Sequence, residues 1–385
     1  MTTNHVFISY SDGFPVYFIA SNTKIRFISK GLIMQGDKVT LINKFYSINN
    51  NAPLHGEEDG IEYYSMPKEG NKVKGAILNS IRVIRLIKSL KETDKRNIVY
   101  VGAGNFFVLA TIMIFARIFG YKVALIQEEF QAGLDLPLLH KINGYLHSFC
   151  LGYLADAILP ISEYLTKVCS RFHKPMFKLP ICADFQNINL PSYKSDNKYF
   201  LYCASAVYHR AFDFVLDSFE IVTKTHPDAF LHLILSGKQC FIDEDREKVE
   251  QRGLDSKVVI MSQLKYDTLL SEYGNSCGLL IPLFNDNIGD VARFSQKISE
   301  YLSTRRPVIS TDVGEVSFYF KDKINMLIAE EVEPNCFAEK MTYVLNNPFE
   351  ADRIGKEGFD YGASLFDYRI ITKKLSDFMD NTFVD

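Results

Sequence analysis

Short apolar runs and amphipathic stretches alternate along almost the whole chain. In the first half, β-rich runs predict strands, and apolar residues at helical spacing predict helices. The predicted strands cover residues 5–9, 38–42, 97–101, 122–126 and 157–160, and the predicted helices cover residues 24–34, 82–90, 106–119, 146–154 and 162–171. Strands that alternate with helices pair in parallel through right-handed crossovers, so we expect a doubly wound α/β sheet.

The polar, aperiodic segment 184–198 interrupts this pattern and predicts a linker. Beyond it, predicted strands cover residues 199–203, 231–235, 258–261, 278–282, 308–310 and 326–329, predicted helices cover residues 212–225, 243–252, 265–276 and 295–303, and the tail is helical from residue 336. A length of 385 residues suits two domains. We expect Rossmann-like domains at 1–185 and 199–365, facing across a cleft, with helix 366–385 packing back on the first.

Composition narrows the class of protein. The apolar fraction of 47% and the charged fraction of 23% are those of a globular protein, and a net charge of -3 argues against a nucleic-acid partner. Seven scattered cysteines without a C-x-x-C pair favour reduced thiols over disulfides or a zinc site. The N-terminus has no secretory pattern. We therefore expect a soluble, cytoplasmic protein.

Two segments leave contact with a membrane open. The apolar segment 106–119 is shorter than the roughly 20 residues of a spanning helix and contains Arg117. We interpret it as a helix buried between a sheet and its neighbours, with membrane contact as the alternative. Segment 72–96 is an amphipathic basic helix. Its cations at spacing three are Arg82, Arg85, Lys88 and Lys91. They form either a solvated face or a site for docking on anionic lipid at the inner membrane face.

The segment FSQKISEYLSTRRPVISTDVGE, residues 294–315, is the most specific pattern in the chain. It closely resembles the signature of family 4 retaining glycosyltransferases with the GT-B fold. Four more segments resemble other parts of that family in order and spacing, namely residues 155–165, 178–188, 201–222 and 231–273. The resemblance implies transfer of a sugar from a nucleotide-diphosphate sugar to a hydroxyl of a glycan or lipid-linked acceptor. Surface polysaccharide or glycoconjugate biosynthesis is the expected setting.

The same segment supplies candidate residues for the donor. Transfer requires stabilisation of the charge on the departing diphosphate by cations and helix N–H groups. Ser295 is a candidate N-cap, and Lys297 in the first turn is the candidate for leaving-group stabilisation. Glu300 follows one turn later on the same face, where it binds the ribose diol, forms an ion pair with Lys297, or does both. Many relatives have a glutamate that contacts the donor sugar, and Ala292 stands at that position here. Asp290 is either a weak substitute for this glutamate or an ordinary loop residue.

The diphosphate-binding Arg and Lys of the family also differ here. Arg210 stands at the Lys position and keeps the cation, so it is the second candidate catalytic residue, whereas Ser205 stands at the Arg position. Lys238, directly after the predicted turn at Gly237, is a candidate to replace the lost cation. No His cluster or carboxylate pair suggests a metal, and the scheme needs no cofactor besides the nucleotide-sugar.

Candidates on the acceptor side come from the first half. Gly13 in SDGFP follows the first predicted strand, where backbone can approach an acceptor closely or simply turn. Glu128 and Glu129 follow the predicted strand 122–126. A carboxylate there either accepts the proton of the acceptor hydroxyl or lies in solvent, and the sequence does not separate the two.

Other functions compete with glycosyl transfer. Gly102 and Gly104 make a lone G-x-G with Phe107 at the third position, so a dehydrogenase is not favoured. A sugar-nucleotide epimerase or a phosphorylase would share the two-domain architecture. Because Ala292 and Ser205 replace expected side chains, a non-catalytic subunit that binds nucleotide-sugar is the alternative from a different class.

Overall fold

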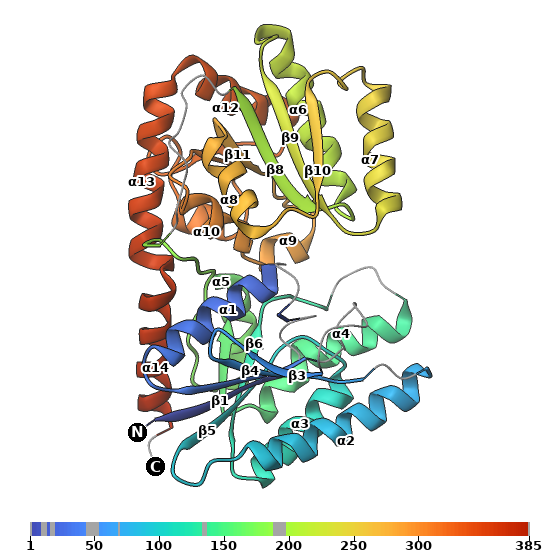
Figure 1. The fold of residues 1–385 in the computed structure, drawn as a ribbon, viewed down its shortest axis with the longest axis vertical. Coiled ribbons are helices and arrows are strands. Elements are labelled where there is room, and N and C mark those ends of the chain that lie inside the picture. Colours follow the sequence, from blue (N-terminus) through green and yellow to red (C-terminus); the bar gives the residue numbers. More distant parts are fainter. Residues whose placement is uncertain are drawn as a thin grey trace. The chain divides into compact units, whose positions relative to one another are not determined.

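The computed structural model describes residues 2–8, 14–15, 20–43, 54–67, 70–132, 137–187 and 198–383. The chain forms two compact units, each with its own sheet (Figure 1). Unit 1 comprises Met1–Cys182, Ala292–Gln296 and Tyr368–Asp385, and unit 2 comprises Ala183–Val291 and Lys297–Asp367. The last helix of the chain therefore belongs to unit 1.

The sheet of unit 1 has the order β3-β4-β2-β1-β5-β6-β7 among the described residues. Its strands are β1 (Thr3–Ile8), β2 (Lys38–Asn43), β3 (His55–Glu58), β4 (Ile61–Ser65), β5 (Arg96–Val101), β6 (Lys122–Gln127) and β7 (Ala157–Pro160). All neighbours are parallel except β3, which runs antiparallel to β4 at the edge. The inner strands are buried on both faces, which explains their continuous apolar runs.

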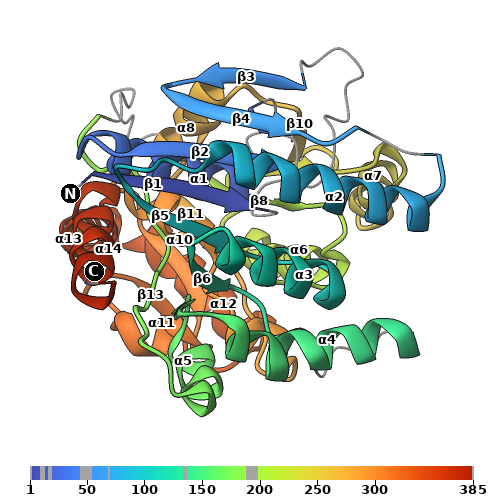
Figure 2. The same cartoon turned by 90° about the horizontal axis from the view of Figure 1, so that it is seen from below.

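Helices cover both faces of this sheet (Figure 2). One layer contains α1 (Ala20–Ile33) and α14 (Tyr368–Thr382), and the other contains α2 (Lys72–Leu90) and α3 (Phe106–Ile118). The remaining elements of unit 1 are α4 (Leu138–Cys150), α5 (Glu163–Cys169) and the short 3-10 helices η1 (Leu151–Leu154) and η2 (Ser170–Phe172). Gly31 lets α14 approach α1, because a Cβ there would collide with the side chain of Thr372.

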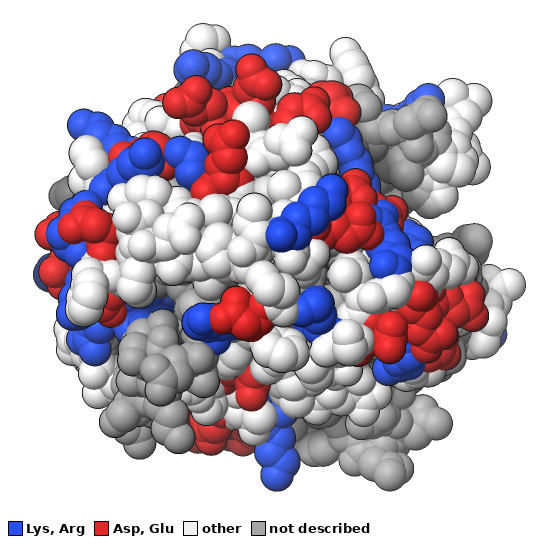
Figure 3. Space-filling view, turned by 90° about the horizontal axis from the view of Figure 1, so that it is seen from above, with Lys and Arg blue, Asp and Glu red and all other residues white. Residues whose placement is uncertain are grey.

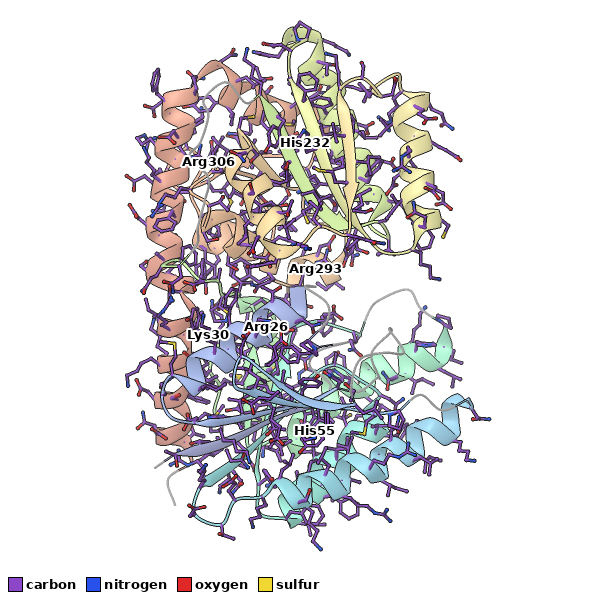
Figure 4. All side chains as sticks on the ribbon, in the orientation of Figure 1. Arg26, Lys30, His55, His232, Arg293 and Arg306 are labelled. Atoms are coloured by element: carbon purple, nitrogen blue, oxygen red, sulfur yellow. The ribbon has the colours of Figure 1, made fainter. Side chains whose placement is uncertain are left out.

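The sheet of unit 2 is parallel throughout, with the order β10-β9-β8-β11-β12-β13. Its strands are β8 (Tyr199–Ser205), β9 (Phe230–Ser236), β10 (Val258–Ser262), β11 (Gly278–Ile281), β12 (Val308–Thr311) and β13 (Leu327–Ala329). Its helices are α6 (His209–Thr225), α7 (Gln239–Gln251), α8 (Tyr266–Asn275), α9 (Ile288–Ala292), α10 (Gln296–Leu302), α11 (Glu315–Tyr319), α12 (Pro334–Asn346) and α13 (Pro348–Phe366). Arg306, labelled in Figure 4, donates to Asp352 at 3.3 Å and so ties the loop before β12 to α13.

The predicted doubly wound α/β architecture is confirmed in both units. The sequence missed β3 and β4, whereas the amphipathic helix predicted over 72–96 begins where α2 begins and extends six residues beyond its end. Of the predicted linker, residues 188–197 lie outside the described part of the chain. The prediction that segment 106–119 is a helix buried between a sheet and its neighbours holds for only one side of the helix. In α3, Leu109 and Ile112 face the core, but Phe107 and Ile118 are 66% and 67% exposed.

None of the helices in the described ranges combines the length and the apolar content that a membrane-spanning segment requires. All seven cysteines are free thiols.

Candidate active site

The carboxyl ends of the unit 2 strands lie along one edge of its parallel sheet. β8 is central, with β9 and β10 on one side and β11, β12 and β13 on the other, so the strand order reverses at β8. Ligands of open parallel sheets bind beyond the carboxyl ends of the strands at such a reversal. The segments that follow β8, β9 and β11 therefore form the candidate site, and they contain the donor residues predicted from the sequence.

Ser205 and Gly237 lie next to each other at this edge. Ser205 ends β8 and pairs in register with Ser236, the last residue of β9. Gly237 has φ of 130°, a value that favours glycine, and a Cβ there would lie 3.7 Å from the Ser205 Oγ. Lys238 follows at the start of α7 with an exposed side chain, its Nζ 6.0 Å from the ring centre of Phe241. The structure thus brings these three predicted residues together.

Arg210 lies in the first turn of α6 and is held by groups that the sequence analysis missed. Its Nη1 donates to Asp286 Oδ1 at 2.6 Å, and its guanidinium stacks 4.0 Å from the ring centre of Phe284. The hydrogen bond to Asp286 raises the pKa of Arg210, and the charge of Asp290 adds to this effect. Both side chains of the pair are more than half exposed, so Arg210 is a charged, accessible cation near Asp290.

Lys297 and Glu300 form a largely buried ion pair on α10. Lys297 Nζ donates to Glu300 Oε2 at 2.8 Å and to the hydroxyl of Tyr273 at 3.1 Å. The side chains of Lys297 and Glu300 are 19% and 2% exposed. The i,i+3 pair that the sequence left open is therefore present, and it lies against a buried tyrosine that the sequence did not single out.

Aromatic side chains and a thiol enclose this pair. The rings of Tyr273 and Tyr301 meet edge-to-face at 5.0 Å, and the Tyr301 hydroxyl accepts the backbone N–H of Cys203 at 3.0 Å. Burial by itself would lower the pKa of Lys297, but Cys203 and Glu300 more than offset it, so the pKa lies above its ordinary value. Lys297 is therefore a fixed positive charge at neutral pH.

The second carboxylate oxygen of Glu300 is one of eleven buried side-chain polar atoms without a hydrogen-bond partner among the described residues. Glu300 Oε1 is buried and has no hydrogen-bond partner. Buried polar atoms are nearly always hydrogen-bonded, because an unsatisfied one loses its hydration without compensation. A hydroxyl donor that reached Oε1 would remove this cost. Glu300 Oε1 could therefore accept a hydrogen bond from a ligand hydroxyl that reached it.

The segment between α9 and α10 carries the remaining donor candidates. Ser295 directly precedes α10, which begins at Gln296. Ala292 ends α9 with a fully buried side chain, and its carbonyl accepts the hydroxyl of Ser162, both within unit 1. Asp290 is half-buried on α9. Gly314 has φ of 60° and ψ of -126°, and a Cβ there would lie 2.9 Å from the carbonyl oxygen of Val291.

In unit 1, Glu128 and Glu129 have different surroundings, although the sequence did not distinguish them. Glu128 accepts a hydrogen bond from Lys24 Nζ at 2.6 Å, and Lys24 is almost completely buried. Loss of hydration and the charge of Glu128 raise the pKa of Glu129, against the opposing charge of Arg293, although the residue itself is exposed. Glu128 is therefore fixed by an ion pair, whereas Glu129 holds a proton more readily than an ordinary glutamate. Gly13 lies outside the described residues.

Tyr273, Asp286 and Lys24 are the partners that sequence reasoning missed. Each acts on a residue far away in sequence, and only the acidic composition of the loop after β11 could have indicated Asp286. Across the described ranges, no three His, Cys, Asp or Glu side chains form a group that could hold a metal ion.

One family model matches part of the chain. Residues 197–347 match the family model described as glycosyl transferases group 1, which covers most of unit 2. No curated protein sequence matches the chain significantly. The matched segment contains Arg210 and the ion pair of Lys297 and Glu300.

Solved structures extend the likeness over the whole chain. Sucrose-phosphate synthase from Thermosynechococcus elongatus has a TM-score of 0.79 at 14% identity, with 99% of each chain covered. Anabaena HepE in complex with UDP and glucose has a TM-score of 0.74 at 11% identity, with 98% of this chain and 99% of that chain covered. An E. coli trehalose-6-phosphate protein bound with UDP-2-fluoro glucose has a TM-score of 0.70 at 10% identity, with 97% and 98% covered. Such neighbours are GT-B proteins with two Rossmann-like domains, so this chain has the GT-B fold.

Proposed function

We propose that this chain is a retaining glycosyltransferase of the family 4 type. It moves a sugar from a nucleotide-diphosphate sugar to a hydroxyl of a glycan or lipid-linked acceptor, in surface polysaccharide or glycoconjugate biosynthesis. The observation that carries the proposal is the buried Lys297–Glu300 pair with its unsatisfied Glu300 Oε1, within the segment that matches the glycosyltransferase family model.

Glu300 is assigned to the ribose of the donor. A ribose presents two neighbouring hydroxyls, and each can donate a hydrogen bond to a carboxylate oxygen. Because Oε1 is buried without a partner, a ribose hydroxyl there gains a charge-assisted hydrogen bond without displacing an existing one. Oε2 already accepts from Lys297, which fixes the orientation of the carboxylate.

Lys297 and Arg210 are assigned to the leaving diphosphate. Negative charge grows on the diphosphate as the glycosidic bond breaks, and cations held in place beforehand stabilise that charge most in the transition state. Lys297 stays protonated at neutral pH, and Arg210 is a charged group in the first turn of α6. Three neighbouring residues add further groups for the diphosphate: Ser205 a hydroxyl, Gly237 a backbone that allows close approach, and Lys238 another cation.

The proposal divides the work between the two halves. Residues 199–365 bind the donor, with Ser295 at the start of α10 and Asp290 toward the sugar in place of the glutamate that Ala292 lacks. Residues 1–185 bind the acceptor, through Gly13, Glu128 and Glu129. The reaction is placed in the cytoplasm and uses neither a metal nor a cofactor, because the cations of the chain neutralise the diphosphate.

The first experiment is a binding screen by calorimetry with UDP- and GDP-sugars, with a CMP-sugar as the monophosphate control. UDP-sugars come first, because structural neighbours were solved with UDP and UDP-glucose. We expect a diphosphate donor to bind the parent and Glu300→Gln to bind it at least tenfold more weakly. If no nucleotide-diphosphate sugar binds the parent, the proposal is wrong.

The second experiment measures turnover as acceptor-dependent release of nucleoside diphosphate. Lys297→Met should lower kcat by about 100-fold or more, because the lost charge acts mainly in the transition state. Lys356→Met, which removes an exposed lysine on α13, is the matched control and should leave kcat unchanged. Anomeric NMR of the product should show the donor's configuration, and inversion would refute the retaining mechanism.

The same materials test the alternatives that the sequence left open. An epimerase would alter the donor sugar without any acceptor, which NMR of donor and protein alone would detect. A non-catalytic subunit would bind donor through Glu300 but release no nucleoside diphosphate with any acceptor. Either result would replace glycosyl transfer as the function.

A further inference from the structure

Helix α3 presents a stripe of large apolar side chains to solvent. Four residues form this stripe on the side of α3 opposite to its buried residues, namely Phe107, Ile114, Phe115 and Ile118. Phe107 and Ile118, at the two ends of the stripe, are 66% and 67% exposed. A water-facing helix normally carries polar residues on this side, so the stripe is a departure that calls for a partner.

Helix α4 continues the apolar character beside α3 (Figures 1 and 2). The backbone N–H of Phe106 donates to the Asn143 side chain at 2.8 Å, which joins α4 to the start of α3. Leu138 and Leu139 are 72% and 78% exposed, and Ile142 and Tyr145 follow on the next turns with exposed side chains. We call the exposed apolar residues of α3 and α4 together the apolar face.

Basic residues border the apolar face, and acidic residues are missing from its helices. The sequences of α2, α3 and α4 contain no Asp or Glu. At the C-terminal end of α3, Lys88 Nζ lies 5.9 Å from the ring centre of Phe119, and Lys91 Nζ lies beside Gly120. Arg85 is exposed on the same helix, α2, as Lys88. On the face shown in Figure 3, by contrast, acidic and basic side chains are interspersed.

Acidic residues near the ends of these helices do not cancel this charge. Glu92, just beyond α2, accepts from Lys38 at 2.8 Å and lies 3.7 Å from Lys95. Asp156 lies 2.8 Å from the guanidinium of Arg117 on α3. Since the whole chain has a net charge of -3, the five basic residues of α2, without an acidic one, are a local asymmetry and not a property of the composition.

We propose that α2, α3 and α4 dock on the surface of an anionic lipid bilayer. The side chains of the apolar face enter the boundary between headgroups and acyl chains, and Arg85, Lys88 and Lys91 contact anionic headgroups. This pairing of an apolar stripe with flanking cations is the chemistry of an interfacial helix, in which burial of apolar area and attraction to anionic lipid add. Long lysine and arginine side chains reach headgroups while their stems cover apolar surface.

A lipid bilayer fits this surface better than a protein partner does. The apolar residues spread over two neighbouring helices with cations along the border, whereas protein interfaces concentrate apolar side chains at the centre and exclude lysine. The proposal deepens the proposed function, because it specifies which residues would bring the enzyme to a lipid-linked acceptor. The docking itself is argued from the exposed apolar side chains and the bordering basic residues. It requires neither binding of the sugar donor nor catalytic turnover.

The test is sedimentation of the full-length protein with vesicles. We expect binding to phosphatidylcholine vesicles that contain phosphatidylglycerol, weaker binding as NaCl rises, and much weaker binding to pure phosphatidylcholine. The variant Arg85→Gln/Lys88→Gln should weaken binding about 30-fold, at about fivefold for each charge. Lys373→Gln, which removes an exposed lysine on α14 in the opposite helix layer, should leave binding unchanged.

Apolar insertion is tested separately from charge. Ile118→Glu and Leu139→Glu lie on different helices, and each should weaken vesicle binding by about tenfold or more. Phe349→Glu is the control, since Phe349 is 89% exposed on α13 of unit 2. Because all three positions are exposed, circular dichroism and melting curves should match the parent, and either apolar variant suffices if the other fails to fold.

Three outcomes would overturn the proposal. The first is no binding of the parent to anionic vesicles at low salt. The second is equal binding by parent, Ile118→Glu and Leu139→Glu. The third is concentration-dependent self-association in sedimentation velocity that Leu139→Glu abolishes while vesicle binding persists, since the apolar face would then join two copies of the chain. Lys297→Met should bind vesicles like the parent while losing turnover, so docking and glycosyl transfer can fail independently.

Discussion

The Lys297–Glu300 pair can be shown to be both a structural and a functional element by removing its charges singly and together. The single variants are Lys297→Met and Glu300→Gln, and the third variant carries both. In each single variant the remaining partner keeps its charge in a site where the native side chains are 19% and 2% exposed. In the double variant neither charge remains, and both replacements are close to the native side chains in size.

Burial sets the size of the expected effects. Leaving one charge of a buried pair without its partner costs about 3–5 kcal/mol of unfolding free energy, whereas replacing both charges costs about 1–2 kcal/mol or less. A loss of that size should lower the unfolding midpoint of a single variant by about 10 °C, and the double variant should recover most of it. Donor affinity should stay low in the double variant, because Oε1 no longer belongs to a carboxylate.

The pH dependence has a definite sign. The pKa of Lys297 is raised in the folded state, so its contribution to stability is complete below the ordinary lysine pKa of about 10.4 and is lost only as the pH rises beyond it. The stability differences should therefore be constant between about pH 6 and 9. Urea unfolding gives the free energies, and calorimetry with UDP-sugars gives the affinities. A double variant as unstable as the single ones, or one that binds donor like the parent, would refute the reasoning.

Three further predictions concern the surrounding site. Arg210→Gln should lower kcat/KM for donor by about 10- to 100-fold, because a charged contact to phosphate is lost, while the midpoint of unfolding changes little, since the bond to Asp286 is exposed. Gly314→Ala should cost about 1–3 kcal/mol in urea unfolding, because φ is 60° and the new Cβ would press on the Val291 carbonyl; a neutral result would show that this segment adapts. EDTA should leave the rate of nucleoside diphosphate release unchanged, and a loss that Mg²⁺ or Mn²⁺ restores would show that a metal takes part.

Local patterns in the sequence were sufficient for most of the fold. The inner strands of both sheets read as continuous apolar runs because helices cover both of their faces, so β1, β5 and β8 were predicted close to their observed bounds. The strand β3 was missed because His55–Glu58 contains no apolar residue and lies at an exposed edge. The exposed stripe of α3 was read as core, because apolar composition does not reveal which side of a helix is covered.

The site was predictable only where its geometry is local. Lys297 and Glu300 are three residues apart on one helix, so their contact follows from helical spacing. Tyr273 reaches Lys297 from 24 residues away, and Lys24 reaches Glu128 across 104 residues. These contacts depend on how strands and helices pack, and no spacing in the sequence encodes them.

The difference between Glu128 and Glu129 leads to a prediction for the acceptor side. Glu128 is held by Lys24, whereas the pKa of the exposed Glu129 is raised by loss of hydration and by the charge of Glu128. A carboxylate with a raised pKa accepts a proton more readily near neutral pH, so Glu129 suits the acceptor hydroxyl better than Glu128 does.

Glu129→Gln should lower the transfer rate by about 100-fold and remove the acid limb of the pH–rate profile. Glu128→Gln should keep that limb and instead lower stability, because Lys24 would remain buried without its partner. If Glu129→Gln retains the parental profile, the proton passes to another group, and Glu129 serves at most to position the acceptor.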